Sequence, residues 1–233
     1  GTITGGTATG DTPPVGVVVD TGPTAHVNYN TITAPRGVWV VGSGSTIFME
    51  GNEISCASDS WNLCGVRVEN GPAGELGFNS ITCEATGADQ YVAGVLALNL
   101  DVNDELVIHS SQISCDNPGG TYDGIRFQNS PVARVWHNVV RGKRAYEGVV
   151  LNIIDVENAD IVWNTFYAET MEHFSTGINF ESSAGTIRAN IVHPGESVGV
   201  TDGNVQAIRF ADTLEPPYEV TLTNNTICGG ATD

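Results

Sequence analysis

Three charged residues in the middle of the chain have the types that acid–base chemistry needs. Asp123, Arg126 and Glu147 come from two successive units of a repeat. A carboxylate pair can hold and move a proton, and an arginine can hold an anionic group. Glycoside hydrolysis needs two carboxylates roughly 5 to 10 Å apart. Two other acidic candidates, Glu69 and Glu181, lie in units too far apart to cooperate, so the sequence favours binding over catalysis.

Aromatic residues precede the same point of the repeat in five successive units. They are Trp61, Tyr91, Tyr122, Tyr146 and Phe174, and each has an acidic residue nearby in the sequence. Such a stripe can stack sugar rings and accept hydrogen bonds from sugar hydroxyls. The same residues can instead cap the core as stacked loop aromatics, and the sequence leaves both interpretations open. Trp61, Tyr91, Tyr122 and Tyr146 are the candidate ligand-binding residues.

These candidates depend on a repeat that runs along the chain, in which a Gly-hydrophobic-x-hydrophobic tetrad is followed by an Asn-x-Ile type triplet. The tetrads begin at Gly16, Gly37, Gly65, Gly94, Gly124, Gly148, Gly177 and Ala207. The triplets begin at Asn30, Asn52, Asn79, Ser111, Asn138, Asn164, Asn190 and Asn225. A recurring unit of about 20 to 50 residues indicates a solenoid, a propeller or an array.

Hydrophobic residues alternate with other residues inside each tetrad and around each triplet. Val38 and Val40, for example, follow Gly37 at a spacing of two. That spacing is the period of a β-strand with one buried face, whereas a helix would need three or four. Each unit therefore offers three short strands that are too small to fold alone. Stacking the units about 4.8 Å apart would pack them into one continuous core.

The repeat resembles that of the right-handed parallel β-helix, the superfold of pectate-lyase-like proteins and of many bacterial surface proteins. The resemblance covers essentially the whole chain. It implies one all-β domain over 1–233, with about eight coils and three short parallel sheets. It also implies a polysaccharide cleft on the outward side of the strand that follows the most variable loops. The outward positions of that strand are Val18, Trp39, Arg67, Leu96, Arg126, Val150, Asn179 and Arg209.

Active members of that superfold carry short motifs that this chain lacks. The Asn-Thr-Asp, paired-Asp, Gly-His-Gly and Arg-Ile-Lys elements of polygalacturonases are missing. The Asp-Pro-His-Glu element of alginate epimerases and the calcium-binding Gly-Gly-x-Gly-x-Asp repeats are missing too. We therefore expect a structural, adhesive or polysaccharide-binding protein. A polysaccharide lyase or glycoside hydrolase acting in the same cleft, through Asp123, Arg126 and Glu147, is the alternative.

The recurrent asparagine of the triplet is expected to be structural. It falls where the chain must turn sharply between two strands, and asparagine tolerates the left-handed backbone region there. Its side chain can also hydrogen-bond its counterparts one coil away. The residues concerned are Asn30, Asn52, Asn79, Asn138, Asn164, Asn190 and Asn225.

Cysteine placement predicts disulfides and an oxidising, extracellular or cell-surface location. Cys56, Cys83 and Cys115 occupy the same position in successive repeats, so they should stack at a distance that suits a disulfide. We expect Cys56–Cys64 to close a loop and Cys83–Cys115 to bridge two coils, which leaves Cys228 for a partner elsewhere. A zinc site is the rival explanation, but the chain has no Cys-x-x-Cys motif and no clustered histidines.

Charge limits the partners. The chain has 27 acidic residues against 9 basic ones, a formal net charge of −18. Repulsion between like charges makes nucleic acid and anionic lipid poor partners. No apolar run is long enough to insert into a membrane. No spacing of histidines predicts a bound metal, so we expect no cofactor and take the acidic residues as a surface coat, with a calcium site as the alternative.

The two ends of the chain raise the question of self-association. The chain opens and closes at the same phase of the repeat, with no polar cap at either end. Uncapped solenoid ends expose unpaired strand edges. We expect either a segment of a longer β-helix or copies of the chain stacked head to tail as an extracellular fibre.

Overall fold

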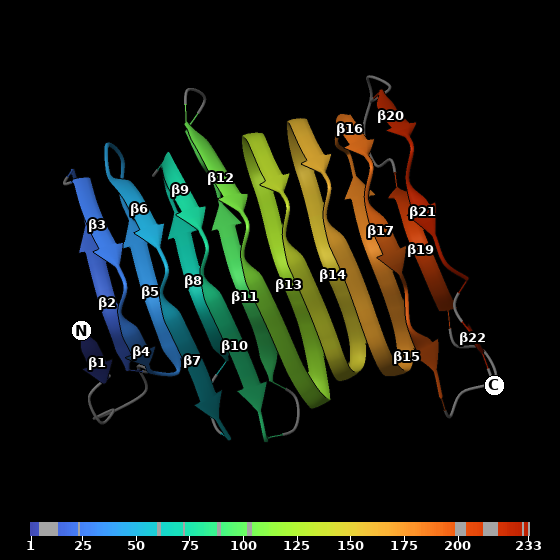
Figure 1. Ribbon diagram of the computed structural model, residues 1–233, viewed down its shortest axis with the longest axis horizontal. Helices are drawn as coiled ribbons and strands as arrows, with labels where there is room; N and C mark the ends of the chain where they lie inside the picture. The colour runs from blue at the N-terminus through green and yellow to red at the C-terminus, as the bar shows by residue number, and fades with distance from the viewer. Residues whose placement is uncertain are drawn as a thin grey trace.

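The chain folds as an all-β parallel solenoid of about seven turns, close to the eight coils expected. The computed structural model describes residues 1–4, 14–22, 24–59, 62–71, 73–87, 90–101, 104–198, 204–211, 219–229 and 231–232. These residues form 22 strands, β1 to β22, and no helix. Figure 1 shows the coils side by side in chain order, with the two termini at opposite ends of the stack.

Hydrogen-bonded pairing between coils is parallel throughout and follows three series of strands, which we call the first, second and third sheets. The first sheet contains β2 (Val15–Asp20), β5 (Arg36–Val41), β8 (Leu63–Glu69), β11 (Tyr91–Leu98), β13 (Gln112–Trp136), β14 (Val139–Val162), β15 (Thr165–Glu181) and β19 (Asn204–Ala211).

The second sheet contains β3 (Thr24–Asn28), β6 (Thr46–Glu50), β9 (Ala73–Gly77), β12 (Glu105–His109), parts of β13 and β14, β16 (Gly185–Arg188) and β20 (Val220–Thr223). The third contains β1 (Thr2–Thr4), β4 (Thr31–Thr33), β7 (Glu53–Ser58), β10 (Ser80–Ala85), parts of β13 to β15, β17 (Ile191–His193) and β21 (Thr226–Ile227). Two further short strands continue the pairing: β18 (Glu196–Ser197) pairs with β15, and β22 (Ala231–Thr232) pairs with β18.

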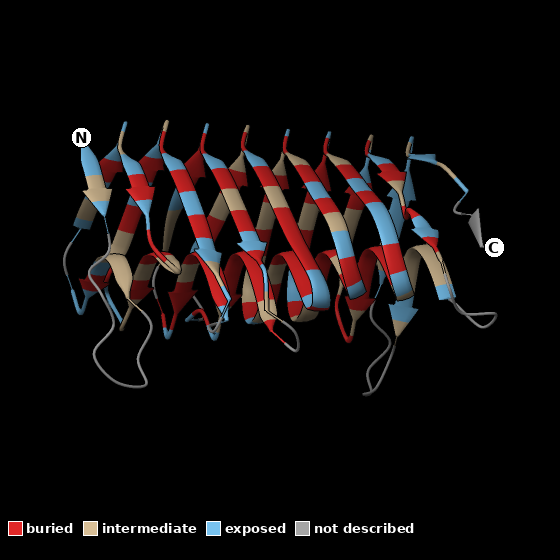
Figure 2. Ribbon diagram, turned by 90° about the horizontal axis from the view of Figure 1, so that it is seen from below, coloured by how far each residue is buried: buried red, intermediate tan, exposed pale blue. Residues whose placement is uncertain are grey.

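The core is a set of stacked columns, as the repeat predicts. One column on the third sheet aligns Ile32, Ile54, Ile81, Ile113, Val140, Phe166 and Val192, and all seven side chains are buried. Buried and exposed residues alternate along the strands in Figure 2, which is the expected period of two. Each coil therefore contributes too little apolar surface to be stable alone, and the stack buries it collectively.

One coil is aligned differently from the expectation. The first sheet pairs Ile125 with Leu151 and Arg126 with Asn152, so the tetrad of this coil begins at Val150 and not at Gly148. Gly148 instead leaves room for a buried ring, because a Cβ there would lie 2.5 Å from Cζ of Tyr122. The outward position of this coil is therefore Asn152, and Val150 is fully buried.

The triplet asparagines form a continuous hydrogen-bonded ladder inside the stack, which confirms their structural role. The backbone N–H of Asn138 donates to Oδ1 of Asn164 at 2.8 Å, and the N–H of Asn164 donates to Oδ1 of Asn190 at 2.8 Å. Each side-chain amide also donates to a carbonyl at the end of the second sheet, as Asn138 does to Ile108 at 2.8 Å. Ser111 replaces asparagine in one coil and accepts through its hydroxyl from the Asn79 N–H.

The left-handed turn residue is not the asparagine itself, as the sequence suggested, but the residue before it. These preceding residues have φ near 55°: Tyr29, Phe78, Ser110, His137, Trp163, Ala189 and Asn224. The asparagine side chain holds the turn from inside the stack, while the residue before it projects outward. A second row of left-handed residues, with Asn70, Asn99, Asn129 and Asp155, marks the corner between the first and second sheets.

Candidate functional site

The outward face of the first sheet brings together two of the three catalytic candidates. Asp123 and Arg126 lie on β13, and Arg126 Nη1 is 3.2 Å from Oδ2 of Asp123. The Tyr91 hydroxyl, one coil earlier, donates to the same oxygen at 2.6 Å. The Asn152 amide, one coil later, donates to Oδ1 at 3.0 Å. Three successive coils therefore hold one carboxylate, which is only 4% exposed.

Burial sets the electrostatics of this carboxylate. Loss of hydration raises the pKa of Asp123, while its bonds to Tyr91, Arg126 and Asn152 favour the charged form and offset part of that rise. Burial and the nearby Asp123 raise the pKa of the Tyr91 hydroxyl well above its usual range. The Tyr91 hydroxyl therefore acts as a donor to Asp123, and the cluster holds this carboxylate in a fixed position on a rigid strand.

The third catalytic candidate, Glu147, lies on the neighbouring coil and has a different partner. Its Oε1 is 3.0 Å from Nδ1 of His173, whose ring stacks on Tyr146 at 5.3 Å with an interplanar angle of 3°. Asp123 pairs in register with Val149, so Glu147 is displaced from Asp123 by one coil and two residues. Strand geometry then gives roughly 8 Å between the Cα atoms of Asp123 and Glu147.

The predicted aromatic stripe is only partly present. Tyr146 is exposed and borders a pocket of about 340 Å³ with Gln90, Gly119, Gly120 and Thr121. Tyr91 is half-buried. Tyr122, in contrast, is 2% exposed and packs inside the stack, so the prediction that it binds ligand is wrong. Its ring fills the space that Gly142 and Gly148 leave open. Trp61 lies outside the described residues.

Polar groups continue along the same face on both sides of Asp123. Toward the C-terminus, Asn179 donates to Asn152 at 2.9 Å and Arg209 donates to Asn179 at 3.2 Å. Asn152 takes the place in this row that the tetrad pattern predicts for Val150, because the tetrad of its coil begins two residues later than expected. Together with Tyr91, these residues form a connected polar strip across five coils.

Toward the N-terminus an apolar patch and a second charged group follow. Cys64, Ala93 and Leu96 form a small buried cluster on the outer side of the first sheet. Beyond it, the Trp39 indole donates to Glu69 at 2.8 Å, and Arg67 Nε donates to the same carboxylate at 2.8 Å. The Arg67 guanidinium lies over the Trp39 ring at 5.6 Å. Glu69, which is too distant from Glu181 to act with it, is therefore held by Trp39 and Arg67.

The predicted disulfides are not formed. Cys56, Cys83 and Cys115 stack in register as expected, but they and Cys64 are buried free thiols. Cys56 lies in the main core, whereas Cys64 belongs to the outer cluster, so the two side chains lie on opposite faces of the sheet wall. The Cys83 thiol donates to the Ala93 carbonyl at 3.4 Å. Cys228 is partly exposed and also a free thiol.

No group of three or more potential ligands for a metal ion occurs in the part of the chain that the structure describes. The described segments also contain no helix with the length and apolar character of a membrane span.

Comparisons with known proteins give the chain no family. No protein-family model matches it, and neither the curated proteins nor the solved structures contain a significant match. The parallel β-helix repeat is therefore the level at which the chain can be classified, and its function has to be argued from its surfaces.

Proposed function

We propose that this chain binds a polysaccharide along the outward face of the first sheet, as an extracellular or cell-surface protein. The observation that carries the proposal is the Asp123 cluster, in which residues from three coils fix one buried carboxylate on a rigid strand. An exposed aromatic, Tyr146, and a pocket of about 340 Å³ lie beside it. Stacking on an aromatic ring and fixed polar groups are what sugar recognition requires.

The shape of the strip suits a polymer more than a small molecule. Polar contacts run without a break from Tyr91 through Asp123, Asn152 and Asn179 to Arg209. Coils are spaced about 4.8 Å apart, so this row extends roughly 20 Å along the stack. The extracellular location now depends on the proposed ligand alone, because the disulfides that suggested it are not formed.

Retention of polysaccharides by the intact chain tests the proposal. We would compare neutral and acidic polymers by affinity electrophoresis, with Tyr146→Ala as the variant and Tyr167→Ala as the matched control. Tyr167 is also exposed and lies against a histidine, His193, but it belongs to the third sheet. Selective loss of retention by Tyr146→Ala supports binding at this face. Equal retention by both variants and the wild type would refute it.

A hydrolase acting at the same place is the second candidate, and one observation favours it. Asp123 is buried with a raised pKa, whereas Glu147 on the next coil is about 40% exposed. Glycosidases use two carboxylates whose environments differ in this way. Release of reducing ends that disappears in both Asp123→Asn and Glu147→Gln would establish catalysis. Retention of a polysaccharide without release of product would support binding and contradict catalysis.

A further inference from the structure

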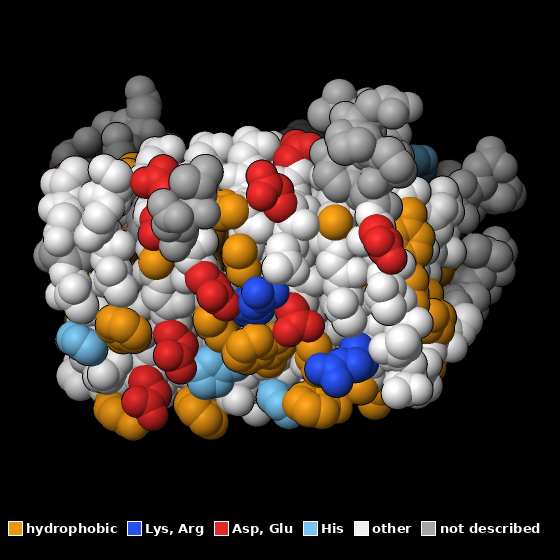
Figure 3. Space-filling view, turned by 90° about the horizontal axis from the view of Figure 1, so that it is seen from above, with side chains coloured by type: hydrophobic (Ala, Val, Ile, Leu, Met, Phe, Trp, Pro, Cys, Tyr) orange, Lys and Arg blue, Asp and Glu red, His pale blue; other side chains and the backbone are white. Residues whose placement is uncertain are grey.

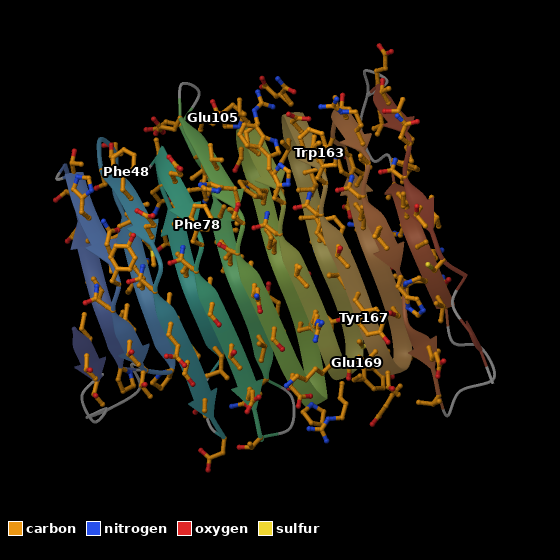
Figure 4. The ribbon with its side chains drawn as sticks, viewed as in Figure 1. Phe48, Phe78, Glu105, Trp163, Tyr167 and Glu169 are labelled. Atoms are coloured by element: carbon orange, nitrogen blue, oxygen red, sulfur yellow. The ribbon has the colours of Figure 1, made fainter. Side chains whose placement is uncertain are left out.

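A different surface, on the second sheet, combines exposed aromatic rings with carboxylates. Phe48 is 37% exposed and Phe78 60% exposed, which is unusual for phenylalanine. Figure 4 shows both rings over the N-terminal half of the second sheet, with Trp163 farther along it. Figure 3 looks onto this side of the molecule and shows hydrophobic and histidine side chains next to acidic ones along one margin.

Phe48 and Phe78 border a pocket of about 330 Å³ on this surface. Glu50 and Glu75 line it from β6 and β9, and His109 closes it from β12. Coil stacking creates the pocket, because its lining residues come from four successive coils and are far apart in the sequence. The turn residue Phe78 is directed outward by its left-handed backbone, with φ at 56°.

The aromatic walls are held in place by histidines. The His26 ring stacks on Phe48 at 5.2 Å with an interplanar angle of 15°. His109 meets Phe78 edge to face at 5.4 Å, and its Nε2 lies 2.7 Å from Oε1 of Glu75. These contacts fix the two phenylalanine rings before any ligand binds, which lowers the entropic cost of binding.

Gly77 leaves space for the His109 ring at the centre of the pocket wall. A Cβ at this position would lie 2.6 Å from Cε1 and Nε2 of the His109 ring. Only glycine therefore lets His109 lie across the neighbouring coil and reach Glu75. The two carboxylates and the two phenylalanine rings line the pocket together with this histidine.

The charge of the pocket points to a cationic ligand. Two carboxylates line it, and the described residues around it include no lysine or arginine. An anionic ligand would be repelled both here and by the net charge of −18. Aromatic faces attract cations through the ring quadrupole, and recognition of alkylammonium groups uses this combination of rings and acids.

We propose that this pocket binds an organic ammonium group, with Phe48 and Phe78 contacting its alkyl or sugar body and Glu50 and Glu75 balancing its charge. The ammonium group can come from a small amine or from an amino sugar. The inference does not depend on the proposed function, because the pocket lies on the second sheet and shares no residue with the Asp123 cluster.

The test compares charged ligands with neutral ligands of the same shape. Choline is paired with 3,3-dimethylbutan-1-ol, and glucosamine with glucose, each titrated into the intact chain and followed by ligand NMR. We expect at least one cation to bind about tenfold more tightly than its neutral partner, with its proton signals shifted upfield by the phenylalanine rings. Choline binding identifies a small-amine site, and glucosamine binding without choline binding identifies an amino-sugar site.

Variants assign the binding to this pocket. Phe78→Ala and Glu75→Gln should each weaken cation binding about three- to tenfold. Both side chains are largely exposed, so neither change should unfold the chain. Tyr167→Ala, which removes an exposed aromatic next to a histidine on the third sheet, should leave binding unchanged. The proposal fails if neither cation binds more tightly than its neutral partner, or if Phe78→Ala binds as the wild type does.

Discussion

The asparagine ladder should be the least replaceable part of this molecule, and Asn138→Ala tests that directly. Asn138 is 1% exposed and lies in the middle of the stack. Its Oδ1 accepts from the Ser111 N–H at 3.0 Å. Its Nδ2 donates to the Ile108 carbonyl at 2.8 Å and to Oδ1 of Asn164 at 3.0 Å. The side chain therefore joins three coils.

Alanine at position 138 would leave the buried Ser111 N–H without its acceptor and would remove a hydrogen bond to the Ile108 carbonyl, which lies in the paired strand β12. The Ser111 N–H and the Ile108 carbonyl lose the only side chain that reaches them, whereas Asn164 keeps the backbone N–H of residue 138 as a donor. The orphaned Ser111 N–H costs about 1 to 3 kcal/mol, and each of the two other lost hydrogen bonds, to Ile108 and Asn164, about 0.5 to 1.5 kcal/mol. We expect Asn138→Ala to lower the free energy of unfolding by about 2 to 5 kcal/mol.

Two further variants calibrate this value. Asn138→Ser should cost about half as much, since the natural Ser111 shows that a hydroxyl can accept from the preceding coil and donate to a carbonyl of its own coil. Asn30→Ala should cost less than about 1 kcal/mol. Asn30 is only partly buried, and its amide donates to the Asn28 carbonyl in an exposed hydrogen bond.

Guanidinium denaturation, followed by tryptophan fluorescence, measures the three free energies of unfolding. Amide hydrogen exchange adds a local readout, because the Ser111 N–H should lose its protection in Asn138→Ala. The reasoning is refuted if Asn138→Ala costs no more than Asn30→Ala, or if the Ser111 amide remains as protected as in the wild type.

Three other predictions concern buried groups. Tyr122→Phe should leave the free energy of unfolding, as measured by denaturation, unchanged or raise it by up to about 1 kcal/mol. The reason is that this buried hydroxyl has no partner among the described residues. A clear loss of stability would contradict this. The folded state raises the pKa of Asp123 above 3.8, so it binds this proton more tightly than the unfolded chain does. The free energy of unfolding should therefore fall as pH rises from 3.8 to the pKa of folded Asp123. Denaturation at several pH values should show a smaller fall for Asp123→Asn than for the wild type. An equal fall in both would contradict this assignment. Burial raises the pKa of Cys64 to about 12. Iodoacetamide at pH 8 should therefore label Cys228 in the native chain and Cys64 only after unfolding, which mass spectrometry would show. Labelling of Cys64 in the native chain would contradict its burial.

Periodicity explains which parts of the fold could be predicted. Ile54, Ile81 and Ile113 align in one buried column, because residues that repeat at a fixed phase must stack when the coils do. The same argument placed Cys56, Cys83 and Cys115 above one another. Stacking does not decide bonding, however, and the thiols donate to nearby carbonyls within their own coils.

Periodicity also explains the error at Val150. A slip of two residues keeps every inward residue inward and every outward residue outward, so the pattern cannot detect it. Gly148-Val149-Val150-Leu151 matches the tetrad as well as its neighbours do. The position of Tyr122 decides the alignment, because its ring occupies the space over Gly148, and that contact exists only in the stacked coils.

The sequence by itself determined the strand period, the stacking of coils, the asparagine positions and the acidic charge, because each is a local or repeating property. The tertiary structure alone decided which aromatic residues face outward and which carboxylates gain partners. Tyr122 turned inward while Phe78 turned outward, and Glu75 met His109 across 34 residues of sequence. Loops between repeats have no period, so their side chains are placed only by contacts between coils.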